Sequence, residues 1–360
     1  MTSNRIPDIP LKQMERISPS RFIALQGCQL REIWQSQREM PSLLPGNTVA
    51  KIGIIIHRML ELTYKGVIRT DYDIVEKWEQ EVHIIEKTMR TNLLDAHLLP
   101  LSQSWNYEVK KLRCFSLVQS LLKGTQTTSS SSIIMNHSEV WLETIDKKIG
   151  GKVDLIRQTT NGAQLIDFKT GSIIDEFSNT VKSEYQTQIK LYAALYNEVT
   201  GLWPDRLTLV GLDRAETDVE YSSGEAEYLL DAAKDLMESI NKNILSNGQE
   251  FFASPKPVTC YYCNFRPACH KYWSQRTFDN AWPTDIHGEV TNIKTSPVGL
   301  LMVEINQDGN ILKVRGLDPV KFNFLNDSVR EVCLCNLKID PIPCFYIPTK
   351  STVGYIVSYL

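Results

Sequence analysis

Two acidic residues and a lysine lie in a stretch, residues 151–171, that has the pattern of a β-hairpin. Two apolar runs are separated by Thr159–Gly162, and Asn-Gly between apolar runs is a strong hairpin signal. Asp154 interrupts the first run, and Asp167 and Lys169 lie in the second. Because side chains alternate along a strand, Asp167 and Lys169 share one face, with Asp154 on the neighbouring strand.

Carboxylates on adjacent strands suit a hard divalent cation such as Mg²⁺ or Mn²⁺. A lysine beside such a cation can orient a bound water or stabilise a developing negative charge. The combination fits metal-assisted hydrolysis of a phosphodiester. The same residues also fit an ordinary hairpin whose charges face solvent, and on these residues alone both interpretations stay open.

Three clustered cysteines form a second candidate metal site. Cys260, Cys263 and Cys269 follow a C-x2-C-x5-C pattern among aromatic and basic residues. Thiolates this close together in a reducing compartment are typical of metal ligands. Cys28 is the natural fourth ligand although it lies far upstream, and His270 is a weaker candidate because it directly follows a ligand. The aromatic flanks and the single remote cysteine favour iron–sulfur, while the spacing alone also allows zinc.

Helices before the hairpin must help to position both groups. A helix that begins at Ser18 is expected to carry Cys28. Residues 51–66 predict a second helix, with His57 in an otherwise apolar stretch. A lone histidine of this kind is more often a core residue than a ligand. Residues 71–123 are mostly helical in pattern, with charged residues on the outer faces.

The composition is that of an ordinary globular protein. Of its 360 residues, 42% are apolar and 22% are charged. A chain of this length has room for two or three domains. Its formal net charge of −3 does not indicate a general nucleic-acid binder, so any basic groove must be local. The polar, proline-spaced start predicts no signal peptide, and no apolar run approaches a membrane span. We therefore expect a cytoplasmic protein whose cysteines are thiols or metal ligands.

The sequence divides into three parts. Residues 1–17 are expected to be a loosely ordered lead-in, and residues 18–275 to form one large domain. Residues 284–360 contain short strand-like segments between turns, which predicts a small β-barrel with an OB-like fold. Lys313 and Arg315 alternate along one of these strands and therefore share a face. We expect that face either to bind single-stranded nucleic acid or to be a solvated edge on a barrel that docks a partner protein.

In this order, the motifs resemble the RecB-family branch of the PD-(D/E)XK nuclease superfamily. They are most similar to its iron–sulfur members, the AddB-type nuclease domains and the CRISPR-adaptation exonucleases, over Ser18 to Trp273. The resemblance rests on SRFIALQGCQLREIW with Cys28, GIIIHRMLE with His57, GGKVDLI with Asp154, LIDFKTG with Asp167 and Lys169, QIKLY with Gln188 and Tyr192, and the trailing C-x2-C-x5-C. The proline that gives the superfamily its name is absent, and the C-terminal barrel lies outside the resemblance.

The resemblance implies an α/β fold, in which a mixed sheet flanked by helices carries a helical insertion and an iron–sulfur cap. It also implies a set of ligands for Mg²⁺ or Mn²⁺: His57, Asp154, Asp167 and the backbone carbonyl of Phe168. Lys169 then activates water or stabilises the phosphorane, and Gln188 and Tyr192 support the site or touch DNA. A structural 4Fe-4S cluster, with zinc as the less favoured metal, is implied on four cysteines: Cys28, Cys260, Cys263 and Cys269.

Two classes of function fit these observations. The first is a metal-dependent DNA exonuclease or endonuclease that acts on single strands or flaps. The second is a catalytically silent iron–sulfur subunit of a nucleic-acid-processing complex, which the intact set of acidic and basic residues argues against. No GxxxxGK[ST] phosphate loop occurs in the chain, so we expect an ATPase or helicase partner. DNA repair, CRISPR adaptation and phage defence all fit as the process.

Overall fold

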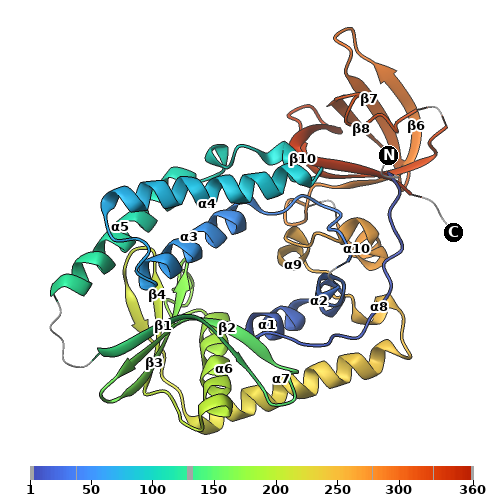
Figure 1. The fold of residues 1–360 in the computed structure, drawn as a ribbon. Coiled ribbons are helices and arrows are strands. Elements are labelled where there is room, and N and C mark those ends of the chain that lie inside the picture. Colours follow the sequence, from blue (N-terminus) through green and yellow to red (C-terminus); the bar gives the residue numbers. More distant parts are fainter. Residues whose placement is uncertain (1–3, 38, 128–132, 278, 327, 358–360) are drawn as a thin grey trace.

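The computed structural model describes residues 4–37, 39–127, 133–277, 279–326 and 328–357. In these ranges it contains a five-stranded sheet with helices on both faces and, towards the C-terminus, a closed five-stranded barrel (Figure 1). The α/β class and the mixed sheet flanked by helices are therefore confirmed. None of the helices in the described ranges combines the length and the hydropathy needed to cross a bilayer.

The sheet has the order β1-β2-β3-β4-β5, with one parallel pair, β3 and β4, and antiparallel neighbours elsewhere. Its strands are β1 (Ile133–Glu143), β2 (Gly150–Thr159), β3 (Gly162–Lys169), β4 (Arg206–Gly211) and β5 (Glu216–Asp218). The predicted hairpin is β2–β3, and its turn is Thr160–Asn161. Gly162 follows the turn at φ 137°, where Asp205 packs so closely that a side chain would collide with its carboxylate. The glycine is thus required at this corner.

One face of the sheet is covered by α3 (Thr48–Tyr64), α4 (Asp71–Thr91) and α5 (Tyr107–Thr127), with short 3-10 turns at Ala96–Leu98 and Leu101–Gln103 between the last two (Figure 1). Asn47 caps α3, and Thr70 and Asp73 form a capping box at the start of α4. Apolar residues recur at helical spacing in α3 and meet Ile166 and Phe168 of β3 in one buried cluster. This packing fixes α3 over the hairpin.

The other face is covered by α6 (Ser183–Thr200) and α7 (Ser223–Ile244), with α1 (Pro19–Gly27) and α2 (Gln29–Ser36) beside them (Figure 1). Residues 4–17 differ from the expected loose lead-in. Ile9, Met14 and Ile17 are buried in the same core as α6 and α7. The backbone N–H of Met14 also donates to the Asn241 side chain at 2.8 Å. Three large apolar side chains at intervals of three to five residues explain why this segment is held down.

After α7 the chain passes through short helices that carry the cysteines and then enters the barrel. These elements are α8 (Gln249–Phe252), α9 (Pro257–Tyr261), a 3-10 turn at Arg266–Ala268 and α10 (His270–Gln275). The barrel strands are β6 (Ile286–Thr295), β7 (Leu301–Gln307), β8 (Asn310–Leu317), β9 (Glu331–Ile339) and β10 (Phe345–Ile356). Their order is β10-β8-β7-β6-β9, and β10 closes the barrel by pairing with β9. Asp308 and Gly309 form the tight turn between β7 and β8, both at positive φ.

A buried ion pair joins the cysteine-bearing segment to the barrel. Arg266 is 3% exposed, and its Nε and Nη2 atoms donate to the two Asp285 oxygens at 2.6 and 3.2 Å. Tyr272 also donates to Asp285, at 2.8 Å, and Arg266 reaches the Asn336 side chain on β9. The hydroxyl of Tyr355 on β10 donates a hydrogen bond to the backbone carbonyl of Leu43. The barrel is therefore held against the rest of the chain by buried polar contacts.

Asp285→Ala is expected to lower the free energy of unfolding by about 3–5 kcal/mol, because it leaves the Arg266 guanidinium buried without its counter-ion. Chemical denaturation followed by circular dichroism measures the change. Glu238→Ala is the matched control, since Glu238 pairs with Lys148 at 2.7 Å on an open surface. If both variants unfold like the parent, the buried pair does not stabilise the structure.

Candidate active site

The hairpin brings the predicted acidic residues and the lysine together. Asp167 and Lys169 share one face of β3, and the Lys169 ammonium lies 2.6 Å from Asp167 Oδ2. Both side chains are largely buried, at 6% and 11% exposure. Asp154 lies on the neighbouring strand, and its Oδ2 accepts a hydrogen bond from the backbone N–H of Phe168 at 2.7 Å. The backbone of β3 thus holds the Asp154 carboxylate in place.

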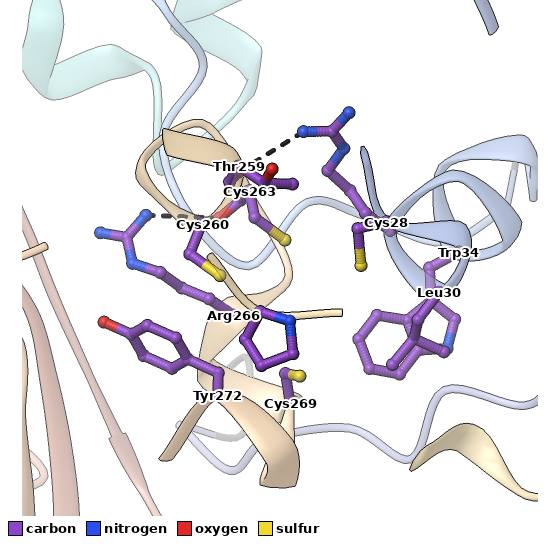
Figure 2. Close-up of a pocket in the computed structure, with 11 residues that line it drawn as sticks. Cys28, Leu30, Trp34, Thr259, Cys260, Cys263, Arg266, Cys269 and Tyr272 are labelled. Atoms are coloured by element: carbon purple, nitrogen blue, oxygen red, sulfur yellow. Dashed lines mark hydrogen bonds between the residues drawn. The ribbon is translucent and has the colours of Figure 1, made fainter. Parts of the chain in front are cut away.

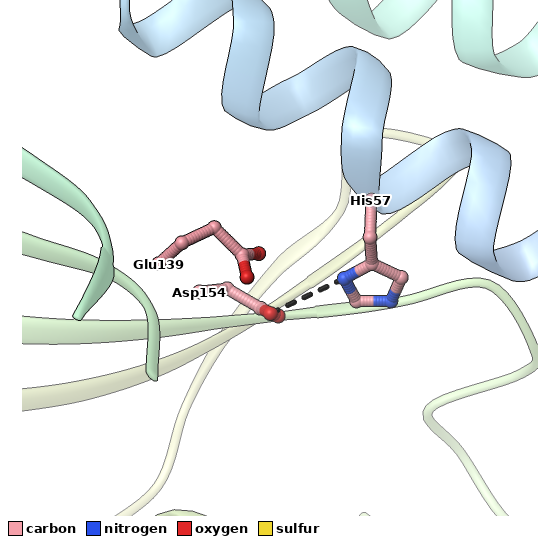
Figure 3. A group of neighbouring side chains, drawn as sticks. All are labelled: His57, Glu139 and Asp154. Atoms are coloured by element: carbon pink, nitrogen blue, oxygen red, sulfur yellow. Dashed lines mark hydrogen bonds and ion pairs between the residues drawn. The ribbon is translucent and has the colours of Figure 1, made fainter. Parts of the chain in front are cut away.

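His57 reaches the same site from the helical layer. The His57 side chain points from α3 toward the hairpin, and its Nδ1 atom lies 3.2 Å from Asp154 Oδ1 (Figure 3). The side chain is about one third exposed, so it is partly buried rather than enclosed in the core. This position agrees with the ligand expected from the family resemblance. The assignment of His57 as a ligand stays a prediction.

Glu139 is a site residue that the sequence did not reveal. The pairs Ser138 with Leu155 and Val140 with Val153 put Glu139 opposite Asp154. Its φ of 56° is uncommon for a residue inside a strand. Ligand atoms of His57, Glu139 and Asp154 all lie within 4.8 Å of one another, and Figure 3 shows the three side chains converging.

Asp167 belongs to a second, adjacent group of side chains. Gln188 of α6 accepts from the Lys169 ammonium at 2.7 Å and donates to Asp167 Oδ1 at 3.4 Å. Tyr192 lies one turn further along α6, is 5% exposed and is hydrogen-bonded to Gln188. The structure therefore brings together all the predicted side chains in two adjacent groups. His57 and Asp154 form one group, and Asp167, Lys169, Gln188 and Tyr192 form the other. The predicted carbonyl ligand of Phe168 stays a prediction, although its N–H touches Asp154.

Gly151 of the GGKVDLI motif, three residues before Asp154, has a packing reason. A Cβ atom on Gly151 would lie 2.9 Å from Pro19 of α1 and 3.1 Å from the Tyr192 ring and hydroxyl. A side chain there would push α1 and α6 away from β2. Glycine thus lets both helices approach the strand that carries Asp154.

Burial and the neighbouring charges shift the pKa values of two residues of the site, His57 and Asp167. Burial lowers the pKa of His57, but the hydrogen bond and negative charge of Asp154 outweigh burial, so the pKa lies above its ordinary value. Burial raises the pKa of Asp167 above its ordinary range, even though Lys169 opposes this. Both groups must lose their protons to act as ligands. The donor set of carboxylates and one imidazole fits Mg²⁺ or Mn²⁺.

The four predicted cysteines line one pocket (Figure 2). The expected continuous helix after Ser18 is interrupted. Cys28 is in an extended conformation between α1 and α2. This break lets its side chain face Cys260, Cys263 and Cys269. Trp34, Leu30 and Tyr272 complete much of the wall.

Four thiols that line one pocket form a donor set of the kind that binds zinc or an iron–sulfur cluster. Burial raises the pKa of Cys260, Cys263 and Cys269 to about 12, so without a cation they stay protonated.

Comparison with known proteins identifies the family. The model of the PD-(D/E)XK nuclease superfamily matches residues 16–270. A comparison with curated proteins finds no match. Among solved structures, one described as "Putative exonuclease" from Eubacterium rectale has a TM-score of 0.37 and 11% identity, and the match covers 74% of this chain and 90% of that one.

A second structure, protein VC1899 from Vibrio cholerae, has a TM-score of 0.20 and 14% identity, with 66% of this chain and 58% of that one covered. The family assignment rests on the sequence model, which spans the hairpin, α3, α6 and all four predicted cluster cysteines. The chain belongs to the PD-(D/E)XK nuclease superfamily.

Proposed function

We propose that this protein is a metal-dependent deoxyribonuclease that cleaves single strands, flaps or strand ends. The observation that carries the proposal is the convergence of His57, Glu139 and Asp154 beside the Asp167–Lys169 pair. Three potential ligands next to a buried ammonium form an arrangement suited to a phosphate undergoing attack. His57, Asp154 and Asp167, with the Phe168 carbonyl, are the proposed ligands from the sequence, and Glu139 is added to them.

When bound, Mg²⁺ or Mn²⁺ supplies Lewis-acid polarisation of the phosphate and lowers the pKa of a water. The Lys169 ammonium stabilises negative charge on the pentavalent phosphorus centre or orients the attacking water. Asp167 and Gln188 hold that ammonium through contacts of 2.6 and 2.7 Å. The Phe168 N–H fixes one oxygen of Asp154, which leaves the other directed at His57. Tyr192 lies beside Gln188, one turn further along α6.

We further propose that the four cysteines hold a structural 4Fe-4S cluster. Three of them come from the segment before the barrel, and Cys28 comes from the junction of α1 and α2. The convergence of four thiols on one pocket supports this proposal, and the aromatic flanks and the single remote cysteine favour iron–sulfur over zinc. Such a cluster ties the N-terminal helices to a segment that follows the sheet.

We also propose that the barrel is an OB-like domain, with the boundary between residues 275 and 284. Five strands closed with a single parallel pair, β8 with β10, support this. The face expected to bind single strands is neutralised by ion pairs. Lys313 lies 3.4 Å from Glu304, and Arg315 lies 2.7 Å from Asp340. These ion pairs favour the alternative, a barrel that docks a partner protein, over single-strand binding through this face.

The process is proposed from the family resemblance alone. An ATPase or helicase partner would supply the strand separation for which this chain has no phosphate loop. DNA repair, CRISPR adaptation or phage defence in the cytoplasm would use such a nuclease.

The proposal is tested with labelled single-stranded, flapped and duplex DNA and anaerobically purified protein. Cleavage is expected with Mg²⁺ or Mn²⁺ and is expected to stop when EDTA is added. A protein that binds DNA but cleaves none of these substrates with either metal would instead support the silent, cluster-bearing subunit.

Glu139→Gln is expected to weaken Mn²⁺ binding by about 10–100-fold, because it removes one negative charge from the convergent group while keeping the shape of the side chain. Calorimetry on the metal-free protein measures the affinity. Glu143→Gln on the same strand is the control, since Glu143 pairs with Arg16 at 2.9 Å away from the convergent group. Equal Mn²⁺ affinity in parent and Glu139→Gln would exclude Glu139 as a ligand.

A further inference from the structure

Two lysines flank the end of β3 from opposite sides of the sheet. Lys110 comes from α5 in the layer that contains α3, and Lys182 is the residue that precedes α6. Lys110 Nζ donates to the backbone carbonyl of Thr170 at 3.1 Å. Lys182 Nζ lies 5.6 Å from the centre of the Tyr185 ring, and Lys169 Nζ lies 4.4 Å from the same ring. Three ammonium groups thus surround the segment where β3 ends.

This place is close to the proposed metal ligands. Gly53 of α3 faces Thr170, with a contact of 3.4 Å from the position of a Cβ atom. His57 follows Gly53 by four residues and therefore lies on the same side of α3, one turn away. Tyr185 lies against Gly171 in the same way, at 3.7 Å. Lys110 and Lys182 are therefore neighbours of the site.

Neither lysine has a carboxylate within ion-pair distance among the residues that the structure describes. Lys110 is only partly exposed, and burial, together with the nearby charge of Arg113, lowers its pKa. Arg113 follows Lys110 by three residues, which puts two like charges on one side of α5. Asp175 feels the charge of Lys182 without an ion pair between them, and its Oδ1 accepts from the backbone N–H groups of Phe177 and Ser178 in its own loop. An anion from outside would satisfy these cations.

We propose that Lys110 and Lys182 bind the sugar-phosphate backbone of the substrate strand on the two sides of Lys169, and so place the reacting phosphate over the site. The inference rests on the proposed nuclease function and names two positioning contacts for it. A lysine serves this purpose as a point charge with several donors, of which Lys110 uses one within the chain. The contacts carry no sequence preference.

The test uses the full chain with its cluster and labelled single-stranded DNA. Fluorescence anisotropy in EDTA, without cleavage, gives the affinity at several salt concentrations. Lys110→Gln with Lys182→Gln is expected to reduce the slope of log affinity against log salt by about 1.4, about 0.7 for each lost phosphate contact. In Mn²⁺, KM is expected to rise while kcat changes little, because ground-state and transition-state binding weaken together.

Lys111→Gln is the matched control, because Lys111 is on the same helix but pairs with Glu79 at 3.0 Å. Its salt slope is expected to equal that of the parent, and Lys110→Arg is expected to restore most of the slope lost in Lys110→Gln. Thermal unfolding of every variant checks the fold. If the parent cleaves DNA and the double variant keeps the full slope and KM, this inference alone is overturned. If the parent neither binds nor cleaves DNA, the proposed function fails and the inference fails with it.

Discussion

Asp154→Asn is expected to reduce metal-dependent DNA cleavage by about 10³-fold or more and to leave the fold intact. The asparagine keeps an oxygen for the Phe168 N–H, which now donates to Asp154 at 2.7 Å. It removes the negative charge that lies between His57 and Glu139. A loss of about 4 kcal/mol of transition-state stabilisation corresponds to this change in rate, and metal ions supply several kcal/mol. Initial rates on labelled single-stranded DNA with saturating Mn²⁺ measure it.

Glu227→Gln is the control, since it removes one carboxylate from the exposed side of α7 without touching the site. Its rate is expected to match the parent. Circular dichroism and thermal unfolding should be the same for all three proteins. If Asp154→Asn cleaves as fast as the parent, the hairpin carboxylates do not form the active site, whatever the family. If its rate falls but its fold is lost, Asp154→Glu and Asp154→Ser, tested in parallel, separate charge from folding.

The features that could be predicted from the sequence are local. The hairpin follows from two apolar runs and an Asn-Gly turn, and the shared face of Asp167 and Lys169 follows from the period of a strand. The cysteine pattern and the barrel strands are also short-range signals. Each depends on neighbours within about ten residues, so the structure agrees with them.

The features that were missed depend on contacts between distant segments. Glu139 is one glutamate among several in a strand-like stretch, and only the register with β2 puts it opposite Asp154. The residues around Cys28 have the pattern of one continuous helix, because no proline marks the break between α1 and α2. The break lies at Cys28, where the side chain faces the cysteine pocket. The apolar side chains of residues 4–17 are separated by prolines and charged residues, yet Ile9 and Met14 are buried in the same core as α7. The intrinsic helix or strand propensity of a segment carries no information on the distant residues that it contacts in the fold.

The second large effect is expected at the cysteine pocket. Cys28→Ser should lose iron, which anaerobically purified parent protein is expected to contain at about four atoms per chain. It should also lower the Tm by about 10 °C or more. Losing a structural metal centre costs several kcal/mol of folding free energy, and each kcal/mol shifts the Tm by about 2–4 °C. The reason is connectivity. In the structure, α2 contacts the cysteine segment through apolar packing, which includes the Trp34 ring against Phe265, and through a long hydrogen bond from Arg31 to the Thr259 carbonyl at 3.4 Å.

Cys344→Ser provides the comparison, because Cys344 is exposed in the loop before β10 and lies outside the pocket. It should keep the iron, the visible absorbance and the Tm of the parent. Iron analysis, the absorbance spectrum and thermal unfolding therefore test the site without any activity measurement. Stoichiometric zinc and no iron in the anaerobic parent would replace the cluster with a zinc site. Metal-free parent protein with the same Tm as Cys28→Ser would mean that the four cysteines are only packing residues, and that buried apolar contacts alone hold α1 and α2 against the segment before the barrel.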